Sequence, residues 1–389
     1  MKPLQPHTMM HTPVLRRTPV RAAIIALLGV MTALLVSSCT GAAAIIPEQG
    51  WSGPTAENSI IYIGSRQGKV LAIKTTDVGI GRPYKLNDKK LPALWRYPAD
   101  EDETIGAVYS TPVIAGNTLL VGALGQNASR TGRGNGDLHA LDKTTGELKW
   151  VFPTKGRIFS DPVVVDGVVY FADDDNERGF VYAVDLEKGE ALWSPFETER
   201  RIWATPTVVD GVIYVAAMDK HLYAIDPKSG SLKSKIKVSG AIASKPLIAA
   251  GVVYFGAFDR RFYAFDLATG QEKWQITTEG WVWNDAMLKD GVVYFGSLGG
   301  IVYALDAETG AERWQADVDG PVRADTLIAG ERLYVADRGG KLSALELKSG
   351  TLRKTETAGA SVLATPFIDG SRIYVSDFKQ NLHVFTIGP

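Results

Sequence analysis

Few residues of this chain combine a reactive side chain with a spacing that supports chemistry. The segment Asp173–Glu177 is rich in carboxylate and amide oxygens, which are ligands that Ca²⁺ prefers. It lacks the glycine placement and the ligand spacing of an EF-hand loop. We therefore expect a solvated hairpin tip there, with calcium binding as the alternative. The sequence has no nucleophile elbow, phosphate-binding loop or dinucleotide fingerprint in a strand, turn and helix context.

The histidines beyond the N-terminal region do not form a cluster in the sequence. His139, His221 and His383 occupy equivalent or neighbouring strand positions of an internal repeat, and Tyr182 and Tyr303 take the corresponding position in two other copies. A position that accepts either His or Tyr is more typical of strand packing than of metal binding or catalysis. We therefore predict no catalytic residue, no metal site and no cofactor.

One set of side chains recurs at the same place in each copy of the repeat. The eight copies align on a position that lies eight residues before the recurring tyrosine and is Pro in most copies. Three residues before that position, the chain carries Trp51, Tyr109, Phe159, Trp203, Ala243, Trp283, Arg323 and Leu363. Two residues later, facing the same way along a strand, it carries Gly53, Thr111, Asp161, Thr205, Lys245, Asp285, Asp325 and Thr365. Aromatic residues and Arg are favoured at binding hot spots. The candidate binding residues are therefore Trp51, Tyr109, Phe159, Trp203, Trp283 and Arg323. The alternative is that both sets only fill a channel mouth.

The elements that must position these side chains recur with a period of 40 residues, as the tyrosines show at Tyr214, Tyr254, Tyr294, Tyr334 and Tyr374. Within one copy, Gly291–Trp314, two β-branched and aromatic runs flank Gly299 and Gly300, which is a hairpin signal. Further extended runs at 283–288 and 312–315 complete four antiparallel strands in each copy.

Eight such units predict an all-β fold, a single eight-bladed β-propeller, because four-stranded sheets in a radial array leave only short, protected edges. The first three units are longer, with insertions at 75–92, 126–136 and 173–179. We expect partner specificity in the insertions of the first two units. The last unit ends after its third strand. It is completed either by a strand from residues 43–46 or not at all, which leaves a three-stranded blade.

The N-terminal region has the features of an exported lipoprotein. A basic stretch that ends at Arg21 precedes the apolar run 22–36, which is short for a membrane span. The run leads to Ser37-Ser38-Cys39, which resembles a bacterial lipobox, and Cys39 is the only cysteine. We predict a signal peptide at 1–38, a tether at 39–50 that is lipidated on Cys39, and the propeller at 51–389. An uncleaved helix or an ordinary signal peptide is the alternative.

An outer-strand tryptophan also recurs, after an Asp and a Gly. In Ala304–Trp314, Asp306 can accept backbone N–H bonds, Gly310 tolerates positive φ, and Trp314 can bury a large surface between sheets. This pattern resembles the tryptophan-docking motif of PQQ-like (quinoprotein-type) propeller repeats. Its predicted docking residues are Trp150, Trp193, Trp274 and Trp314. We expect weaker interfaces where blade 4 has Ser234, blade 7 has Lys354 and blade 1 has a displaced Trp95.

The resemblance implies two possible activities. One branch of these repeats comprises PQQ-dependent alcohol dehydrogenases, whose vicinal disulfide is impossible with a single cysteine. The other is the family of the barrel-assembly lipoprotein BamB, whose members bind partners without the cofactor. The lipobox favours the second branch.

We expect a non-catalytic, lipid-anchored scaffold for protein–protein interactions in the cell envelope, as a monomeric propeller. Its expected partners are envelope proteins, in particular the barrel-assembly machinery. Its expected location is the periplasmic face of the outer membrane or, in a one-membrane organism, the cell surface. The alternatives are a PQQ-dependent oxidoreductase and a cell-surface propeller that binds glycans or proteins. The net charge of -1, with both signs interspersed, argues against nucleic-acid binding.

Overall fold

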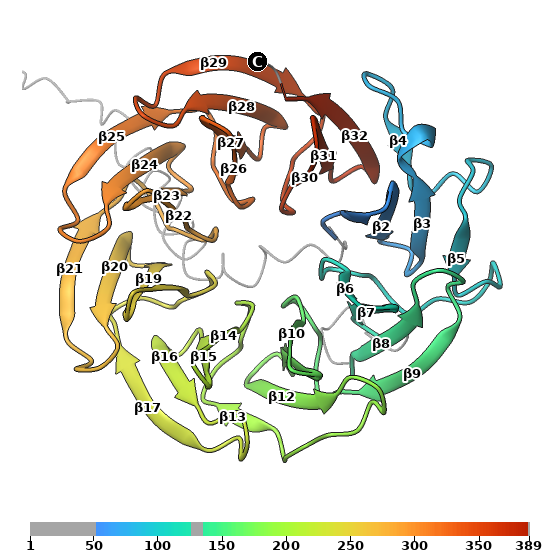
Figure 1. Cartoon of the computed structure of the whole chain (residues 1–389), viewed down its shortest axis with the longest axis horizontal. Helices are drawn as coiled ribbons and strands as arrows, with labels where there is room; N and C mark the ends of the chain where they lie inside the picture. Colours follow the sequence, from blue (N-terminus) through green and yellow to red (C-terminus); the bar gives the residue numbers. More distant parts are fainter. Residues whose placement is uncertain (1–51, 126–134, 388–389) are drawn as a thin grey trace, which may run out of the picture. The chain divides into compact units, whose positions relative to one another are not determined.

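The computed structural model describes residues 52–125 and 135–387. Residues 49–389 form one compact unit. In its described part, eight four-stranded antiparallel sheets are set as blades around a ring (Figure 1). The prediction of an all-β, eight-bladed β-propeller is confirmed. The predicted signal peptide, Cys39, the tether, Trp51 and most of the insertion at 126–136 lie outside the described residues.

Each blade is a meander of strands that follow one another outward from the ring axis (Figure 1). Blade 1 contains β1 (Thr55–Glu57), β2 (Ile60–Gly64), β3 (Val70–Lys74) and β5 (Trp95–Tyr97). Blade 2 contains β6 (Val113–Ala115), β7 (Thr118–Ala123), β8 (Asp137–Asp142) and β9 (Leu148–Pro153). Blade 3 contains β10 (Val163–Val165), β11 (Val168–Asp174), β12 (Gly179–Asp185) and β13 (Phe196–Thr198). Blade 4 contains β14 (Thr207–Val209), β15 (Val212–Ala216), β16 (His221–Ile225) and β17 (Leu232–Lys237).

The second half of the ring repeats this pattern. Blade 5 contains β18 (Leu247–Ala249), β19 (Val252–Ala257), β20 (Arg261–Asp266) and β21 (Glu272–Thr277). Blade 6 contains β22 (Met287–Lys289), β23 (Val292–Gly296), β24 (Ile301–Asp306) and β25 (Glu312–Asp317). Blade 7 contains β26 (Leu327–Ala329), β27 (Arg332–Ala336), β28 (Lys341–Glu346) and β29 (Leu352–Thr357). Blade 8 contains β30 (Phe367–Asp369), β31 (Arg372–Ser376), β32 (Asn381–Thr386) and β4 (Tyr84–Lys85).

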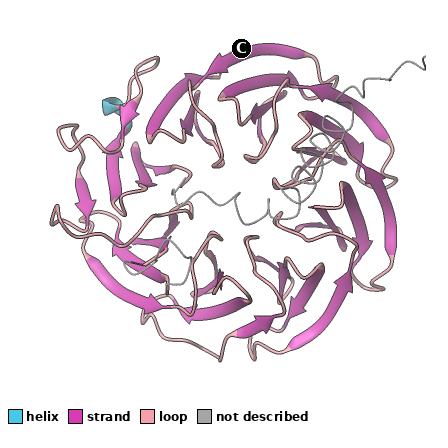
Figure 2. Cartoon of the chain, turned by 180° about the vertical axis from the view of Figure 1, so that it is seen from behind, coloured by secondary structure: helices cyan, strands magenta, loops and turns pink. Residues whose placement is uncertain are grey.

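The described part of the chain is almost entirely strand and loop, with one short 3-10 turn at Thr75–Asp77 (Figure 2). None of its helices has the length and apolarity needed to cross a bilayer.

The hydrophobic core lies in layers between neighbouring blades. The two middle strands of a blade face a neighbour on both sides, which explains their nearly continuous apolar sequences. Thus β24 is buried at four consecutive positions, whereas β25 is mostly exposed. Between blades 5 and 6, the rings of Phe262 and Phe295 stack with their centroids 3.8 Å apart. Each blade is therefore stable only against its neighbours.

Connections alternate between the two faces of the ring, because consecutive strands are antiparallel. The turns after the first and third strands of each blade lie on one face, which we call the turn face. The hairpins after the second strands and the loops that lead to the next blade lie on the other, which we call the mouth face.

A tryptophan on the outer strand ties one blade to the next. The indole N–H of Trp314 donates to the carbonyl of Leu347 in blade 7 at 2.9 Å. Its ring covers Gly350, where an added Cβ would lie 2.5 Å from the indole and where φ is 68°. Only glycine suits this position, because it has no Cβ to clash with the indole and it tolerates a positive φ. The same contacts join Trp150 to Leu186 and Gly189, Trp193 to Pro227 and Gly230, and Trp274 to Ala307 and Gly310.

The expectation of a weaker contact at blade 1 is wrong. Trp95 follows a long connection, yet its indole lies on Gly146 and its N–H donates to the carbonyl of Lys143 at 3.1 Å. Blade 4 lacks the tryptophan contact, as expected from Ser234 at the tryptophan position. A Cβ added at Gly270, the equivalent glycine in blade 5, would meet no atom within 4 Å.

Blade 8 is closed by a strand from the insertion in blade 1. Tyr84 of β4 pairs with Leu382. Just beyond β4, the N–H of Leu86 donates to the carbonyl of Gln380 at 2.9 Å. Tyr84 and Leu86 are buried in the core shared by blades 1 and 8. The sheet therefore has four strands, so the expected alternative of a three-stranded blade is wrong. Its fourth strand is β4 rather than the other expected candidate, segment 43–46, which lies outside the described residues. Two buried apolar side chains explain why the insertion takes this place.

The buried indole of Trp274 makes the blade contact testable. Trp274→Ala leaves a cavity between blades 5 and 6 and removes one of the two hydrogen bonds to the Ala307 carbonyl, so we expect a loss of about 3–5 kcal/mol in the free energy of unfolding. Urea unfolding of the variant would measure it. Gln275→Ala, at the exposed next position of β21, is the matched control. Equal losses in the two variants would contradict the role of the indole.

Candidate functional site

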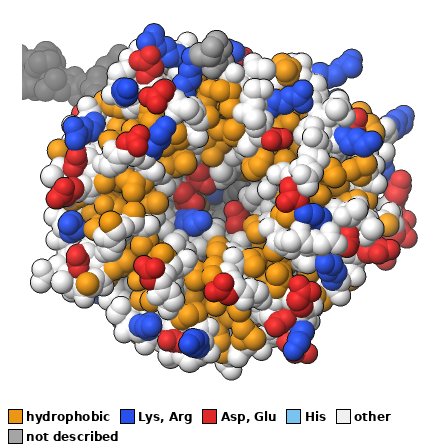
Figure 3. All heavy atoms as spheres, in the orientation of Figure 1, with side chains coloured by type: hydrophobic (Ala, Val, Ile, Leu, Met, Phe, Trp, Pro, Cys, Tyr) orange, Lys and Arg blue, Asp and Glu red, His pale blue; other side chains and the backbone are white. Residues whose placement is uncertain are grey.

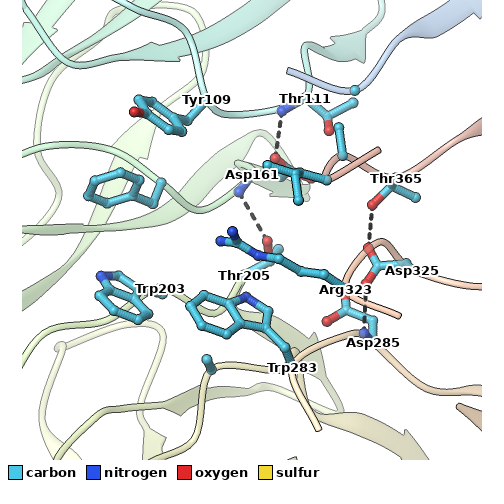
Figure 4. Close-up of a pocket in the computed structure, with 15 residues that line it drawn as sticks. Tyr109, Thr111, Asp161, Trp203, Thr205, Trp283, Asp285, Arg323, Asp325 and Thr365 are labelled. Carbon is cyan, nitrogen blue, oxygen red and sulfur yellow. Dashed lines mark hydrogen bonds between the residues drawn. The ribbon is translucent and has the colours of Figure 1, made fainter. Parts of the chain in front are cut away.

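The loops that lead from each blade to the next bring the predicted residues together at the ring axis. Five of the six candidates line one cavity of about 110 Å³ on the mouth face, namely Tyr109, Phe159, Trp203, Trp283 and Arg323 (Figure 4). The sixth, Trp51, lies outside the described residues. The second predicted set, two residues further along each strand, lines the same cavity at seven of its eight positions, namely Gly53, Thr111, Asp161, Thr205, Asp285, Asp325 and Thr365. In the space-filling view, acidic and basic side chains border the hollow at the centre of the ring (Figure 3).

The upper level of the cavity is aromatic. The rings of Trp203 and Trp283 stack with centroids 5.2 Å apart, and the Arg323 guanidinium lies 4.1 Å from the Trp283 centroid. Tyr109 meets Phe159 edge to face at 5.0 Å. A guanidinium over an indole face is attracted by the ring quadrupole. Burial lowers the pKa of Arg323 to about 10, which leaves it charged at neutral pH.

Two further aromatic residues extend this level, and the sequence interpretation missed both. Phe258, in the hairpin between β19 and β20, stacks on Trp281 at 4.8 Å and also lies 4.9 Å from Trp283. Trp281 stands two residues before Trp283, so strand periodicity could have indicated it. Phe258 has no such local signal. The four rings of Trp281, Phe258, Trp283 and Trp203 form one continuous, half-buried stack over blades 4 to 6.

The lower level is a ring of hydrogen bonds that runs from blade to blade. At equivalent positions, the backbone N–H of one blade donates to the side chain of the next: Thr111 to Asp161 at 2.6 Å, Asp161 to Thr205 at 3.0 Å, Lys245 to Asp285 at 2.7 Å, and Asp285 to Asp325 at 2.6 Å. The Thr365 hydroxyl donates to Asp325. These carboxyls therefore hold neighbouring blades in register at the axis.

Burial makes this lower level a set of weak acids. It raises the pKa of Asp161 to about 6, and it raises the pKa values of Asp285 and Asp325 as well. The charge of Asp325 adds to the effect at Asp285, whereas the Lys245 ammonium opposes it at all three carboxyls. The three half-buried carboxyls interact with one another, so the protonation of one affects that of the others.

The prediction of a solvated tip for the acidic segment is wrong for its first two residues. Asp173 and Asp174 are fully buried, because the long hairpin of β11 and β12 carries them beneath the mouth. Asp173 accepts from the Tyr182 hydroxyl at 2.8 Å. Asp174 forms an ion pair with Arg157 at 2.9 Å and accepts the Trp203 indole N–H at 3.1 Å. Asp174 thus orients a residue of the aromatic level.

The three strand histidines are separate from the mouth residues. His383 pairs with Asp377 at 2.9 Å, and His221 lies 3.2 Å from Asp219. Burial lowers the pKa of His139 to about 4, so its imidazole is neutral at pH 7. Residues 52–125 and 135–387 contain no group of three or more His, Cys, Asp or Glu placed to hold a metal ion.

The raised pKa of Asp161 predicts a pH-dependent stability. Its folded value of about 6 exceeds the unfolded value of about 3.9, so the folded state binds the proton more tightly. The stabilisation from this group is complete below about pH 4 and is lost as the pH rises through about 6. Asp161→Asn keeps an acceptor for Thr111 and removes the titration. We expect the variant to be more stable than the parent by about 1–3 kcal/mol near pH 8, with about two-thirds of this advantage lost near pH 4.5.

Urea unfolding of both proteins at the two pH values would measure this difference. Titrations far from Asp161 cancel, whereas loss of its charge also lowers the pKa of Asp285 and adds to the effect in the same direction. Glu308→Gln, an exposed carboxyl on the turn face, is the matched control. A difference between parent and Asp161→Asn that does not change with pH would contradict the account.

Comparisons with known proteins agree with this architecture. The family model described as outer membrane protein assembly factor BamB matches residues 92–203, 177–327 and 298–387. Among solved structures, the chain is similar to BamB from Moraxella catarrhalis, with a TM-score of 0.67 and 18% identity over 86% of this chain and 94% of that one. It is also similar to the computationally designed Ika8 protein, with a TM-score of 0.69 and 14% identity over 88% of this chain and 97% of that one. At these identities the likeness concerns the fold alone. No curated protein matches the chain in sequence. The family model spans more than half of the chain, which therefore belongs to the family of the outer membrane protein assembly factor BamB.

Proposed function

We propose that this protein is a non-catalytic scaffold of the cell envelope that binds another protein at the mouth of its ring. The observation that carries the proposal is the stack of half-buried aromatic rings with Arg323 at the mouth. Trp, Tyr and Arg are the residues that most often dominate binding energy at protein interfaces. The family description, an assembly factor, agrees with this role.

The lower level of the mouth makes the upper level a suitable docking surface. Hydrogen bonds between blades fix the loops that carry the aromatic residues. Asp174 also fixes the indole of Trp203. Side chains that are ordered before binding lose little entropy when a partner arrives. In this proposal the lower level holds the blades in register and the aromatic level binds the partner.

The cofactor that the quinoprotein-type repeat suggests does not fit this mouth. PQQ is a tricyclic tricarboxylate, and pockets for ligands of that size have volumes of roughly 300 Å³ or more. The cavity here is about 110 Å³ and presents Asp161, Asp285 and Asp325 to its interior. Its small volume and like charge both oppose PQQ, which supports a function without the cofactor.

The location and partner follow from the N-terminal sequence and from the family. A lipidated Cys39 would hold the propeller at a membrane on the outer side of the cytoplasmic membrane. In a two-membrane cell, Thr40 rather than Asp after the cysteine is compatible with transfer to the outer membrane. The proposed partner is a protein component of the outer-membrane assembly machinery.

Loss of the stacked tryptophans tests the docking surface. We expect Trp203→Ala with Trp283→Ala to reduce recovery of assembly-machinery components from native membranes by about thirtyfold or more, since a hot-spot residue contributes about 2 kcal/mol or more. Affinity purification with quantitative mass spectrometry would measure the recovery. Leu352→Ala, at an exposed position of β29, is the control. An intact melting curve with unchanged recovery would leave the mouth as a filled channel only.

Replacement of Cys39 tests the anchor separately. We expect the parent protein to incorporate labelled palmitate and to sediment with membranes, because two or more acyl chains hold a protein stably at a bilayer. The Cys39→Ala variant should incorporate no label. Equal labelling of parent and variant would show that Cys39 is not the acylated residue.

A further inference from the structure

A second surface of interest lies on the outer side of blade 1, away from the mouth. It is a groove of about 980 Å³ beside β5, formed where the insertion of blade 1 departs from the repeat. Its walls come from the segment after β4, from the loop 98–104 and from the turn of blade 2 at 145–148. A volume of this size is typical of a ligand site.

The floor of the groove is apolar and partly open to solvent. Leu94 and Leu148 are 46% and 47% exposed, and both line the groove. Trp95 and Tyr97 also line the groove and are half-buried. Large apolar side chains that gather in one hollow, rather than singly, mark an interaction surface.

One lip of the groove is acidic. Glu101, Asp102 and Glu103 line it, directly after Asp100 in the sequence, and acidic side chains gather beside β5 at the right rim in Figure 3. In the described part of the chain, only Glu101 of these four forms an ion pair, with Lys89 at 2.5 Å.

The other cations of the groove are occupied by backbone carbonyls. Lys69 donates to the carbonyls of Pro98 and Asp100, and Arg96 donates to that of Leu91 at 2.6 Å. Asp102 and Glu103 form no ion pair in the described part of the chain, and they interact with Lys89 and Lys69 only at longer range. The groove is lined by four carboxylates, Glu101, Asp102, Glu103 and Glu147, against three cations, Lys69, Lys89 and Arg96, and this excess favours a positively charged guest.

The groove also contains an open strand edge. β5 is the last strand of its sheet and pairs only with β3, through Val70, Leu71 and Ala72. All three residues of β5 line the groove. An extended peptide can add to such an edge through main-chain hydrogen bonds, while its side chains enter adjoining pockets.

We propose that this groove binds an extended segment of a partner polypeptide in which apolar side chains alternate with Lys or Arg. The apolar side chains pack on Leu94 and Leu148, the cations pair with Asp102 and Glu103, and the backbone pairs with β5. This contact is independent of the mouth and gives the scaffold a second docking surface. The insertion that creates the groove also closes the ring through β4, so the surface is fixed to a rigid part of the fold.

A defined peptide tests the proposal on the full chain in lipid nanodiscs, with empty nanodiscs as the blank. The probe is a short fluorescein-labelled peptide in which Lys alternates with Leu and Val. One matched peptide has Glu for Lys, and a second has Ser for Leu and Val. Fluorescence anisotropy measures binding, and hydrogen exchange of the β5 amides reports its place.

We expect saturable binding of the basic apolar peptide alone, with slower exchange in β5. Asp102→Lys with Glu103→Lys should weaken it about tenfold, and Leu148→Ser should weaken it as well. Glu308→Lys, an exposed charge reversal on the turn face, and Trp203→Ala with Trp283→Ala at the mouth should leave it unchanged.

Several results would overturn the proposal. These are no binding above the blank, equal binding of the Glu peptide, no effect of the reversal at Asp102 and Glu103, or an equal effect of Glu308→Lys. Loss of binding in the mouth variant would place the peptide there instead. All the substituted groove residues are exposed, and a melting curve for each variant confirms folding.

Discussion

The contact between an outer-strand indole and a positive-φ glycine in the next blade is the interaction on which the structure depends. A single blade has two apolar faces and is not stable alone, so it must be held at a fixed angle to both neighbours. Trp314 over Gly350 shows how this is done, with a large flat ring on a residue that has no side chain and one hydrogen bond to Leu347. The contact recurs at Gly146, Gly189, Gly230 and Gly310 and holds most neighbouring blades together, and hydrogen bonds such as that from Thr111 to Asp161 then fix the loops at the axis.

Those fixed loops divide the mouth into two levels with different tasks. The carboxyls of the lower level, such as Asp161 and Asp285, accept hydrogen bonds from neighbouring blades, and partial loss of hydration raises their pKa values. The aromatic residues above them, such as Trp203 and Trp283, remain partly exposed and are held in place from below and from the side. A surface that is both exposed and ordered is what a docking site requires, and it is the physical basis of the scaffold function proposed for this chain.

Structural features that recur in every copy of the repeat could be predicted from the sequence, whereas features of single blades were missed. The blade count, the docking Asp, Gly and Trp, and the two levels of the mouth recur at a constant spacing, so local patterns were sufficient. The strand at Tyr84–Lys85 was missed because its partner lies at the far end of the chain. Burial of Asp174 and the contact of Trp95 with Gly146 also depend on tertiary packing, which no local pattern encodes. Phe258 joins the aromatic stack from a hairpin tip, a position that carries no periodic signal.

Site-specific photo-crosslinking in native membranes can show which face of the ring binds a partner. A photoreactive amino acid would be placed at position 281 on the mouth face, and at position 308 on the turn face for comparison. The account predicts a crosslink from position 281 to a protein component of the outer-membrane assembly machinery, and none from position 308. Equal crosslinking from the two faces, or a crosslink from position 308 alone, would contradict it.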